Sequence, residues 1–288
     1  MRPTMMRLGL SRSVEELAGD PGAPLTQWRE WGISVIELRR VDEETPPEEV
    51  ARAARRVWSA GLALAVHARL PKEAVGATLG ELFPGLSGVL RELRERGEAV
   101  VVPVHAYAAQ AESESRLAAR TREALRRAVD AAEREGVPLR FAVELNRAKG
   151  PADPSVTYEG VLALVEGLPA GICWDFGHGC SNARRGLLAE TPPAAFLDAV
   201  THTHIHDIGP GGDTHWPLTQ GVVPVSQYVE RLLSAGYEGI LNLELSEERY
   251  AGRVDAAEAV CASIQHLQQC VKCARVISFR GKVGISAW

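Results

Sequence analysis

The feature that most constrains the fold is a regular alternation of short apolar, β-type runs with helical stretches along nearly the whole chain. This alternation is typical of parallel strand–helix units, because parallel neighbours must be joined by a crossover segment. Eight runs can be counted, which is the number of strands in a closed (β/α)8 TIM barrel of the α/β class. The predicted strands are Arg7–Leu10, Ile33–Leu38, Leu62–His67, Ala99–His105, Leu139–Leu145, Gly171–Asp175, Val200–His206 and Ile240–Leu245.

Helices are expected between these strands. Pro46-Pro47-Glu48-Glu49 opens one that ends by Gly61, and others are expected at 113–136, 224–236 and about 254–271. A short basic tail, Lys272–Lys282, follows and leads to Trp288; it could cover the barrel bottom or join a contact in a homo-oligomer. Because no linker or shift in composition divides the 288 residues, we expect a single domain over 1–288, with the barrel at about 6–250 and the last helix and tail at about 254–288.

Composition and charge exclude several classes of protein. With 32 Lys and Arg against 37 Asp and Glu, the net charge is −5 and offers no overall attraction for nucleic acid or an anionic membrane. No apolar run reaches the ~18 residues that cross a bilayer, and the start lacks the apolar stretch of a signal peptide. The five cysteines, of which only Cys270 and Cys273 form a CxxC, are interpreted as reduced thiols. We therefore expect a cytoplasmic protein without a membrane partner.

Alternation within the strands predicts which side chains point into the barrel. In the run 141–146, Phe141, Val143 and Leu145 share one face, whereas Ala142, Glu144 and Asn146 share the other. The runs 62–67, 172–175 and 241–246 show the same parity. Large apolar residues should therefore face the helices, and small and polar residues should face the barrel interior.

Most of the inward polar residues come at the carboxyl ends of the predicted strands, which meet at one mouth in a closed barrel. Carboxylates and imidazoles crowded there would repel one another and shift their pKa values, and a divalent cation resolves that repulsion. We predict such a metal ion at Glu144, Asp175, His204 and Glu244. For Glu37, an ion pair with Arg39 or Arg40 and a substrate contact are both open. The full set of strand-end residues is Glu37, His67, His105, Glu144, Asp175, His204 and Glu244.

Further polar residues follow these strand ends. His178 stands three residues after Asp175, and we expect the glycines around it to turn it back over the mouth. Asp213 and His215 lie in a long, Gly-rich segment, 207–223, and such loops in compact domains are usually functional. One of His202 and His206 is expected to support a ligand or contact the substrate, and His202, deeper in the barrel, could be an ordinary core histidine.

Together these residues resemble, in order, the motifs of the xylose-isomerase-like TIM-barrel superfamily, which holds sugar isomerases and epimerases together with endonuclease IV, of the AP endonuclease family 2. The resemblance covers nearly the whole chain up to about residue 270 and is specific for the superfamily rather than for one reaction. The motifs are Ala142-Val143-Glu144-Leu145-Asn146, Cys173-Trp174-Asp175-Phe176-Gly177-His178, His204-Ile205-His206-Asp207, Asp213-Thr214-His215 and Asn242-Leu243-Glu244.

The isomerase and epimerase members imply one divalent metal ion, Mn, Co, Mg or Zn, held by the residues that match Glu144, Asp175, His204 and Glu244. They also imply that Glu144 and Glu244 move a proton as base and acid, through an enediolate of a small polyhydroxylated carbonyl substrate. By the same resemblance His178 would bind the substrate. Arg184 and Arg185 could grip a phosphate or carboxylate, or simply be solvated surface charges, and His206 and Glu37 are further candidates for substrate contact.

The endonuclease members suggest a different enzyme, a phosphodiesterase for abasic DNA with three zinc ions. Every ligand type of that enzyme is present, which adds His67, His105, His178, Asp213 and His215 as possible metal ligands. However, the run 213–221 lacks the arginine and the Gly-Glu-Gly ending of the endonuclease pattern, and His206 also departs from it. Because the chain is also net acidic, we favour sugar chemistry. A non-catalytic binding barrel would be expected to lose one of the two glutamates, and both are present.

Overall fold

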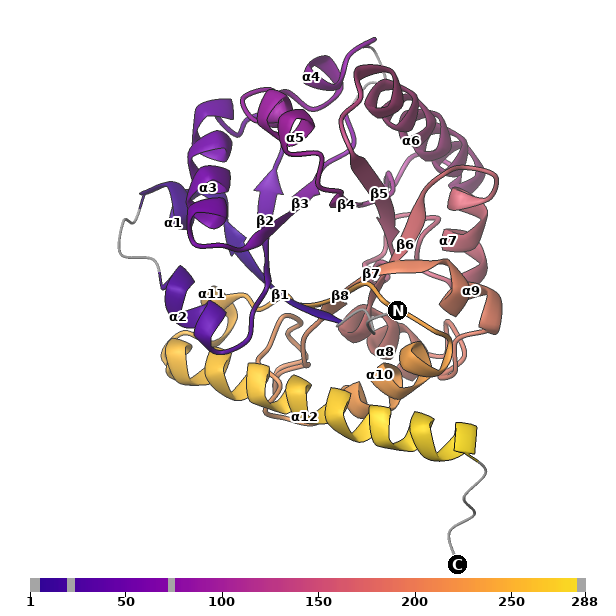
Figure 1. The fold of residues 1–288 in the computed structure, drawn as a ribbon. Helices are drawn as coiled ribbons and strands as arrows, with labels where there is room; N and C mark the ends of the chain where they lie inside the picture. The colour runs from indigo at the N-terminus through magenta and orange to yellow at the C-terminus, as the bar shows by residue number, and fades with distance from the viewer. Residues whose placement is uncertain (1–5, 20–23, 72–75, 284–288) are drawn as a thin grey trace, which may run out of the picture.

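The computed structural model of the chain describes residues 6–19, 24–71 and 76–283. Its eight strands are all parallel and close into a barrel in the order β1 to β8, with β1 pairing with β8 (Figure 1). This confirms the (β/α)8 barrel predicted from the alternation of runs. The strands are β1 (Arg7–Ser13), β2 (Val35–Val41), β3 (Ala63–Ala68), β4 (Val100–Val104), β5 (Leu139–Glu144), β6 (Gly171–Asp175), β7 (Val200–Ile205) and β8 (Ile240–Leu243).

Helices and helical turns surround the barrel. Those expected from their punctuation are present, and Ser113 caps the longest barrel helix by accepting a hydrogen bond from the Arg116 N–H. They are α1 (Val14–Gly19), α2 (Leu25–Glu30), α3 (Pro47–Ser59), α4 (Leu79–Leu82), η1 (Pro84–Leu86), α5 (Leu90–Arg96), α6 (Glu114–Glu135), α7 (Tyr158–Val165), α8 (Phe176–Arg184), α9 (Ala194–Ala199), α10 (Val225–Ser234), α11 (Glu247–Tyr250) and α12 (Ala256–Val283).

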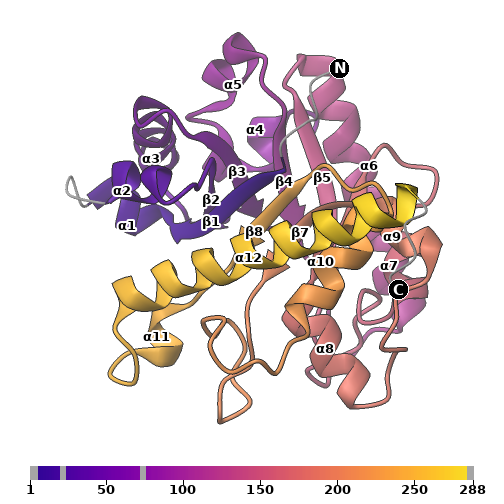
Figure 2. The same cartoon turned by 60° about the horizontal axis from the view of Figure 1, so that its bottom comes forward.

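The C-terminal helix is longer than the sequence pattern predicts. We expected it to end near Val271, but α12 continues to Val283, so the expected basic tail is helical, and Trp288 lies outside the described residues. α12 packs along α10, and the Gln268 side chain donates to the carbonyl of Trp31 after α2 (Figure 2). Basic residues are compatible with the last turns of a helix, because the carbonyl end of its dipole is negative.

The core has two parts, as the parity of the strands predicts. Phe141, Val143 and Trp174 belong to the large layer between strands and helices. A small separate cluster plugs the barrel interior and consists of Val35, Ala65, Val101, Ala142, Cys173 and Ile240. Because this plug is apolar, the polar side chains of the barrel interior gather towards the carboxyl ends of the strands.

The loop after β7, together with α8 and α11, lies at the bottom of Figure 2, where the carboxyl ends of β6, β7 and β8 are found. All five cysteines are free. Within residues 6–19, 24–71 and 76–283, no helix is both long and apolar enough to cross a membrane.

Candidate metal centre

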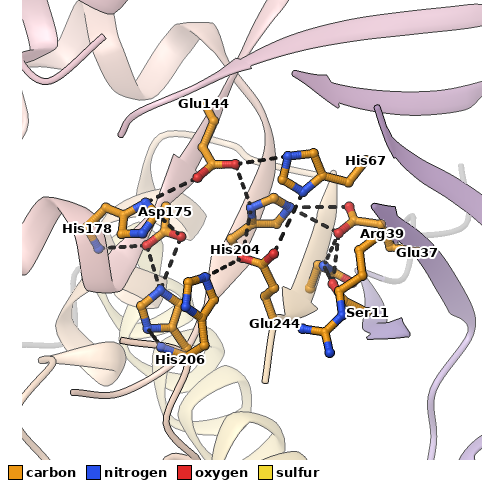
Figure 3. A network of polar contacts seen from close by, with 12 residues as sticks. Ser11, Glu37, Arg39, His67, Glu144, Asp175, His178, His204, His206 and Glu244 are labelled. Carbon is orange, nitrogen blue, oxygen red and sulfur yellow. Dashed lines mark hydrogen bonds and ion pairs between the residues drawn. The ribbon is translucent and has the colours of Figure 1, made fainter. Parts of the chain in front are cut away.

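The strand ends bring Glu144, Asp175 and His204 together at the mouth of the barrel as one group of possible metal ligands, and Glu244 joins them through its contact with His204 (Figure 3). His204 stands at the centre of this cluster. Its Nδ1 atom lies 3.1 Å from Oε2 of Glu144 and 3.3 Å from Oε2 of Glu244. A single ring nitrogen carries at most one proton, so it cannot donate a full hydrogen bond to both carboxylates. The arrangement is therefore suited to a cation between the three side chains.

Asp175 and His178 are joined by a helix cap rather than by the glycine turn that we expected. α8 begins directly after β6, and Oδ1 of Asp175 accepts a hydrogen bond of 2.7 Å from the His178 N–H. Nδ1 of His178 then lies 3.1 Å from Glu144 and 3.2 Å from Asp175. Gly177 is required for packing, because a Cβ atom there would lie 1.9 Å from Cε1 of His206.

A buried layer supports His204 from the side opposite the cluster. Its Nε2 atom lies 3.1 Å from Oε1 of Glu37, and His202 contacts the other oxygen of Glu37 at 2.8 Å. Ser11 and Asn242 also donate to Glu37, at 2.8 and 3.1 Å. The sequence analysis did not predict Ser11, and it quoted Asn242 only as part of a motif without a role, since small polar residues inside strands carry no distinctive signal.

Glu37 therefore lies below the mouth, and among the described side chains no ion pair joins it to Arg39. β2 runs to Val41 rather than ending at Leu38, which places Glu37 in the strand interior, fully buried. His202 is buried beside it, as expected of the deeper histidine. A carboxylate behind a metal-binding imidazole orients the ring and raises its basicity as a ligand.

The loop after β7 brings two more histidines to the cluster. Nε2 of the fully buried His206 lies 3.1 Å from Asp175, so His206 holds this carboxylate in place. His215 stacks on His206 with ring centroids 4.5 Å apart, and it lies 3.4 Å from Glu244. The backbone of His215 has a φ of 63°, a left-handed conformation that is uncommon outside glycine and concentrates at functional sites.

Asp207 organises that loop, a role that sequence reasoning missed. Its carboxylate accepts hydrogen bonds from the backbone N–H groups of five residues, at distances between 2.6 and 3.1 Å. The donors are Ile208, Gln220, Gly221, Val222 and Val223. The only available signal was its place in the His204-Ile205-His206-Asp207 run, and that run does not reveal which groups an aspartate binds.

His67 and His105 also reach the cluster. Nε2 of His105 lies 3.1 Å from Oε2 of Glu144, and Nε2 of His67 lies 3.5 Å from the same oxygen. The His105 side chain is 47% exposed, whereas that of His67 is 11% exposed. His67, His105 and Glu144 form one group of possible metal ligands, and Asp175, His178, His206 and His215 form another.

Three expected residues are not part of the cluster. Asp213 lies 3.8 Å from Arg249 at the surface and belongs to no group of possible ligands in the described part of the chain. Arg185 donates to the carbonyl of Ala148, and Arg184 lines a separate cavity between α8 and α10. Arg184 ends α8 and Arg185 is its C-cap, while Asp213 stands in the loop after β7, and these elements direct the three side chains away from the cluster.

Charge holds the carboxylates ionised. Burial raises the pKa of Glu144, but His105 and His204 lower it more. Burial also raises the pKa of Glu244, and His204 lowers that value more. Both pKa values therefore lie well below the ordinary one of a glutamate. Burial likewise raises the pKa of Asp175, and His178 and His206 bring it below the ordinary value. Burial lowers the pKa of His204, but the groups around it raise it well above 6.5; they are Cys173, Glu244, Glu37 and Glu144.

The chemistry of the donors fits a divalent metal ion. Within the cluster, several buried ring nitrogens and one carboxylate oxygen make no hydrogen bond of good geometry despite their ion-pair contacts, among them Nδ1 of His204, both ring nitrogens of His178 and Oε2 of Glu244. Buried polar atoms without partners are costly. A mixed set of imidazole nitrogens and carboxylate oxygens suits Zn2+, Mn2+ or Co2+.

Comparison with known protein families decides the relationship. The sequence profile of the family described as xylose isomerase-like TIM barrel matches residues 25–270, which is most of the chain. The chain belongs to the xylose isomerase-like TIM barrel family. Among known sequences, an uncharacterised protein of Methanocaldococcus jannaschii, MJ1188, is 40% identical over 53 residues, 18% of this chain and 19% of that protein. The match thus spans about a fifth of that relative.

Solved structures share the fold of this xylose isomerase-like barrel at low sequence identity. A D-tagatose 3-epimerase-like protein superposes with a TM-score of 0.64 and 18% identity, covering 94% of this chain and 98% of that one. A xylose isomerase domain protein from Alicyclobacillus acidocaldarius gives 0.62 and 16%, covering 94% and 100%. The IolI protein, solved with a zinc atom, gives 0.53 and 17%, covering 96% and 99%. At these identities the likeness shows the fold.

In this xylose isomerase-like barrel a cavity of about 230 Å³ borders the cluster, lined among others by His67, His105, His215 and Glu244. This volume is below the 300–1,000 Å³ usual for drug-sized ligands. Glu244 is the carboxylate of the cluster that reaches both the centre, through His204, and the cavity. A small molecule in the cavity would therefore lie next to Glu244.

Proposed function

We propose that the protein is a divalent-metal-dependent isomerase or epimerase of a small polyhydroxylated carbonyl compound. The observation that carries this proposal is the pair of ionised glutamates, Glu144 and Glu244, on the same nitrogen of His204 beside the cavity. Membership of the xylose isomerase-like family and the likeness in fold to a D-tagatose 3-epimerase-like protein support it.

Glu144, Asp175, His204 and Glu244 would hold the metal ion. Bound there, a divalent cation supplies Lewis-acid stabilisation of negative charge on the substrate oxygens. Both glutamates are ionised, so each begins as a base. One would accept the proton from the hydroxyl-bearing carbon next to the carbonyl, and in isomerisation the carboxylic acid so formed would give it to the former carbonyl carbon. In epimerisation the other glutamate, after taking a proton from solvent, would act as the acid and protonate the opposite face.

Exchange of substrate hydrogen with solvent tests this proton transfer. With metal-loaded protein in D2O, deuterium should enter the carbon next to the carbonyl of a ketose such as D-fructose or D-tagatose. Glu244→Gln should abolish the exchange, because an amide cannot accept the proton, whereas Glu159→Gln on the exposed start of α7 should leave it unchanged. Metal content of both variants must be measured. Exchange retained by Glu244→Gln with the metal bound would remove Glu244 from the proposed role.

The second candidate is a multi-zinc phosphodiesterase, which the two additional groups of possible ligands favour. Its weakness is that Asp213 pairs with Arg249 instead of joining His215. Metal analysis after purification without chelator separates the candidates. About one ion per chain agrees with the isomerase or epimerase, whereas three zinc ions together with nicking of abasic DNA would favour the phosphodiesterase.

A further inference from the structure

Positively charged side chains outnumber negatively charged ones in the lining of the cavity beside the cluster, although binding a neutral sugar requires no such excess. Three arginines line it, Arg39, Arg69 and Arg249, together with Glu244 and Glu248. The side chains of Arg69 and Arg249 are 75% and 52% exposed, whereas that of Glu244 is 8% exposed. Arg69 and Arg249 therefore form the outer part of the cavity, and the carboxylate of Glu244 forms its floor.

Arg39 is the most constrained of the three. It stands two residues after Glu37 on β2, so both side chains start from the same face of the strand, and Figure 3 shows Arg39 extending past Glu37. Its Nη1 donates to the carbonyl of Leu245 at 3.1 Å. Across the described residues no carboxylate lies within 4.0 Å of this half-buried guanidinium. Charged groups below the surface normally have a partner of opposite charge.

Arg69 and Arg249 have carboxylate partners only at the limit of an ion pair. Arg69 lies 3.9 Å from Asp42, and Arg249 lies 3.8 Å from Asp213. Exposed pairs of this kind contribute little to stability, since solvent screens them. Both guanidinium groups are therefore free to turn towards an anion in the cavity at small cost.

We propose that this cavity binds an anionic group of the substrate, a phosphate or a carboxylate, with Arg39 as its main contact and Arg69 and Arg249 at its rim. This inference rests on the proposed function and names its class of substrate. The ionised floor repels an anion, while the arginines attract it and can bind it with forked hydrogen bonds. A substrate with one charged end is then oriented, with that end outward and its carbonyl end towards Glu244.

A matched series of ligands tests the proposal. We would measure binding of D-fructose, D-fructose 6-phosphate and D-fructuronate to metal-loaded protein by calorimetry. At least one anionic compound should bind about tenfold or more tightly than D-fructose, and the stronger of the two identifies phosphate or carboxylate. Arg39→Ala should bring this affinity ratio close to one. Arg91→Ala, which removes an exposed arginine of α5, should leave it unchanged.

Arg69→Ala and Arg249→Ala remove exposed side chains, so these variants should fold even if Arg39→Ala does not. Each of the two should reduce the affinity ratio between the anionic compound and D-fructose. Equal affinity for all three compounds, or no binding of either anionic one, would overturn the anionic subsite. Deuterium exchange, followed in the same samples, reports the proposed function separately. Tighter binding of an anionic compound without deuterium exchange would support the anionic subsite and contradict the isomerase or epimerase activity. Deuterium exchange without tighter binding of an anionic compound would support the activity and contradict the subsite.

Discussion

At the scale of single residues, the support of His204 explains how one imidazole can face two carboxylates. With Nε2 directed at Glu37, the lone pair of Nδ1 is free for a metal ion. Ser11, Asn242 and His202 complete the shell of Glu37, so that its charge is compensated in the barrel interior. Burial raises the pKa of Glu37, but His204 and His202 lower it far more, and the carboxylate stays ionised.

Glu37→Gln is expected to weaken metal binding about 10- to 100-fold, the usual effect of removing a carboxylate behind a ligand histidine. The amide nitrogen of the glutamine would also face side chains that donate hydrogen bonds to Glu37 in the native protein, such as Ser11 and Asn242. Because donors cannot bond to a donor, the free energy of unfolding should fall by about 1–3 kcal/mol. Chelator competition measures the affinity and urea titration the stability, with Glu238→Gln at an exposed position as the control. Lower stability with unchanged metal affinity would show that Glu37 does not act through His204.

At the scale of secondary-structure elements, α8 and the loop after β7 complete the centre together. The cap at Asp175 starts α8 immediately at the strand end, and Asp207 gathers the loop, so that His206 can sit against Gly177. A glycine in the first turn of a helix normally lowers helix stability, and here packing overrides this preference.

Gly177→Ala therefore tests the contact between α8 and the loop. The added methyl group would push His206 away from Asp175, and we expect a loss of about 1–3 kcal/mol and weaker metal binding. Gly80→Ala in α4 is the matched control, because its nearest neighbour would be 3.5 Å away, and it should be neutral or stabilising by up to about 1 kcal/mol. Urea titrations of both variants measure the difference. Equal stabilities would contradict the close packing.

At the scale of the whole molecule, the cluster couples folding to pH and metal. Burial lowers the pKa of His204 and of His206, but Cys173 and the glutamates around His204, and Asp175 beside His206, raise both values above 6.5. A histidine with a raised pKa contributes stability that is complete below the unfolded value and is lost as the pH rises through the folded value. The carboxylates have lowered pKa values, so their contribution is present at neutral pH and is lost only in acid.

The metal-free protein should consequently become less stable between about pH 6 and pH 9, by about 1–3 kcal/mol. A divalent metal ion should remove this loss, because it binds deprotonated ligands and takes the place of the protons. Urea midpoints at both pH values, with chelator and with Mn2+ or Zn2+, measure the effect. A metal-free midpoint that is constant or rises over this range would contradict the arrangement.

The sequence by itself predicted the eight strands, their inward faces and the strand-end side chains of Glu144, Asp175, His204 and Glu244, because period-two alternation is a local property of each strand. Only the tertiary structure decided the depth of Glu37 and the exclusion of Asp213, Arg184 and Arg185. It also brought Arg39 to the cavity. The level of a residue inside a barrel depends on strand stagger, and the direction of a loop depends on hydrogen bonds such as those of Asp207, which join distant parts of the chain.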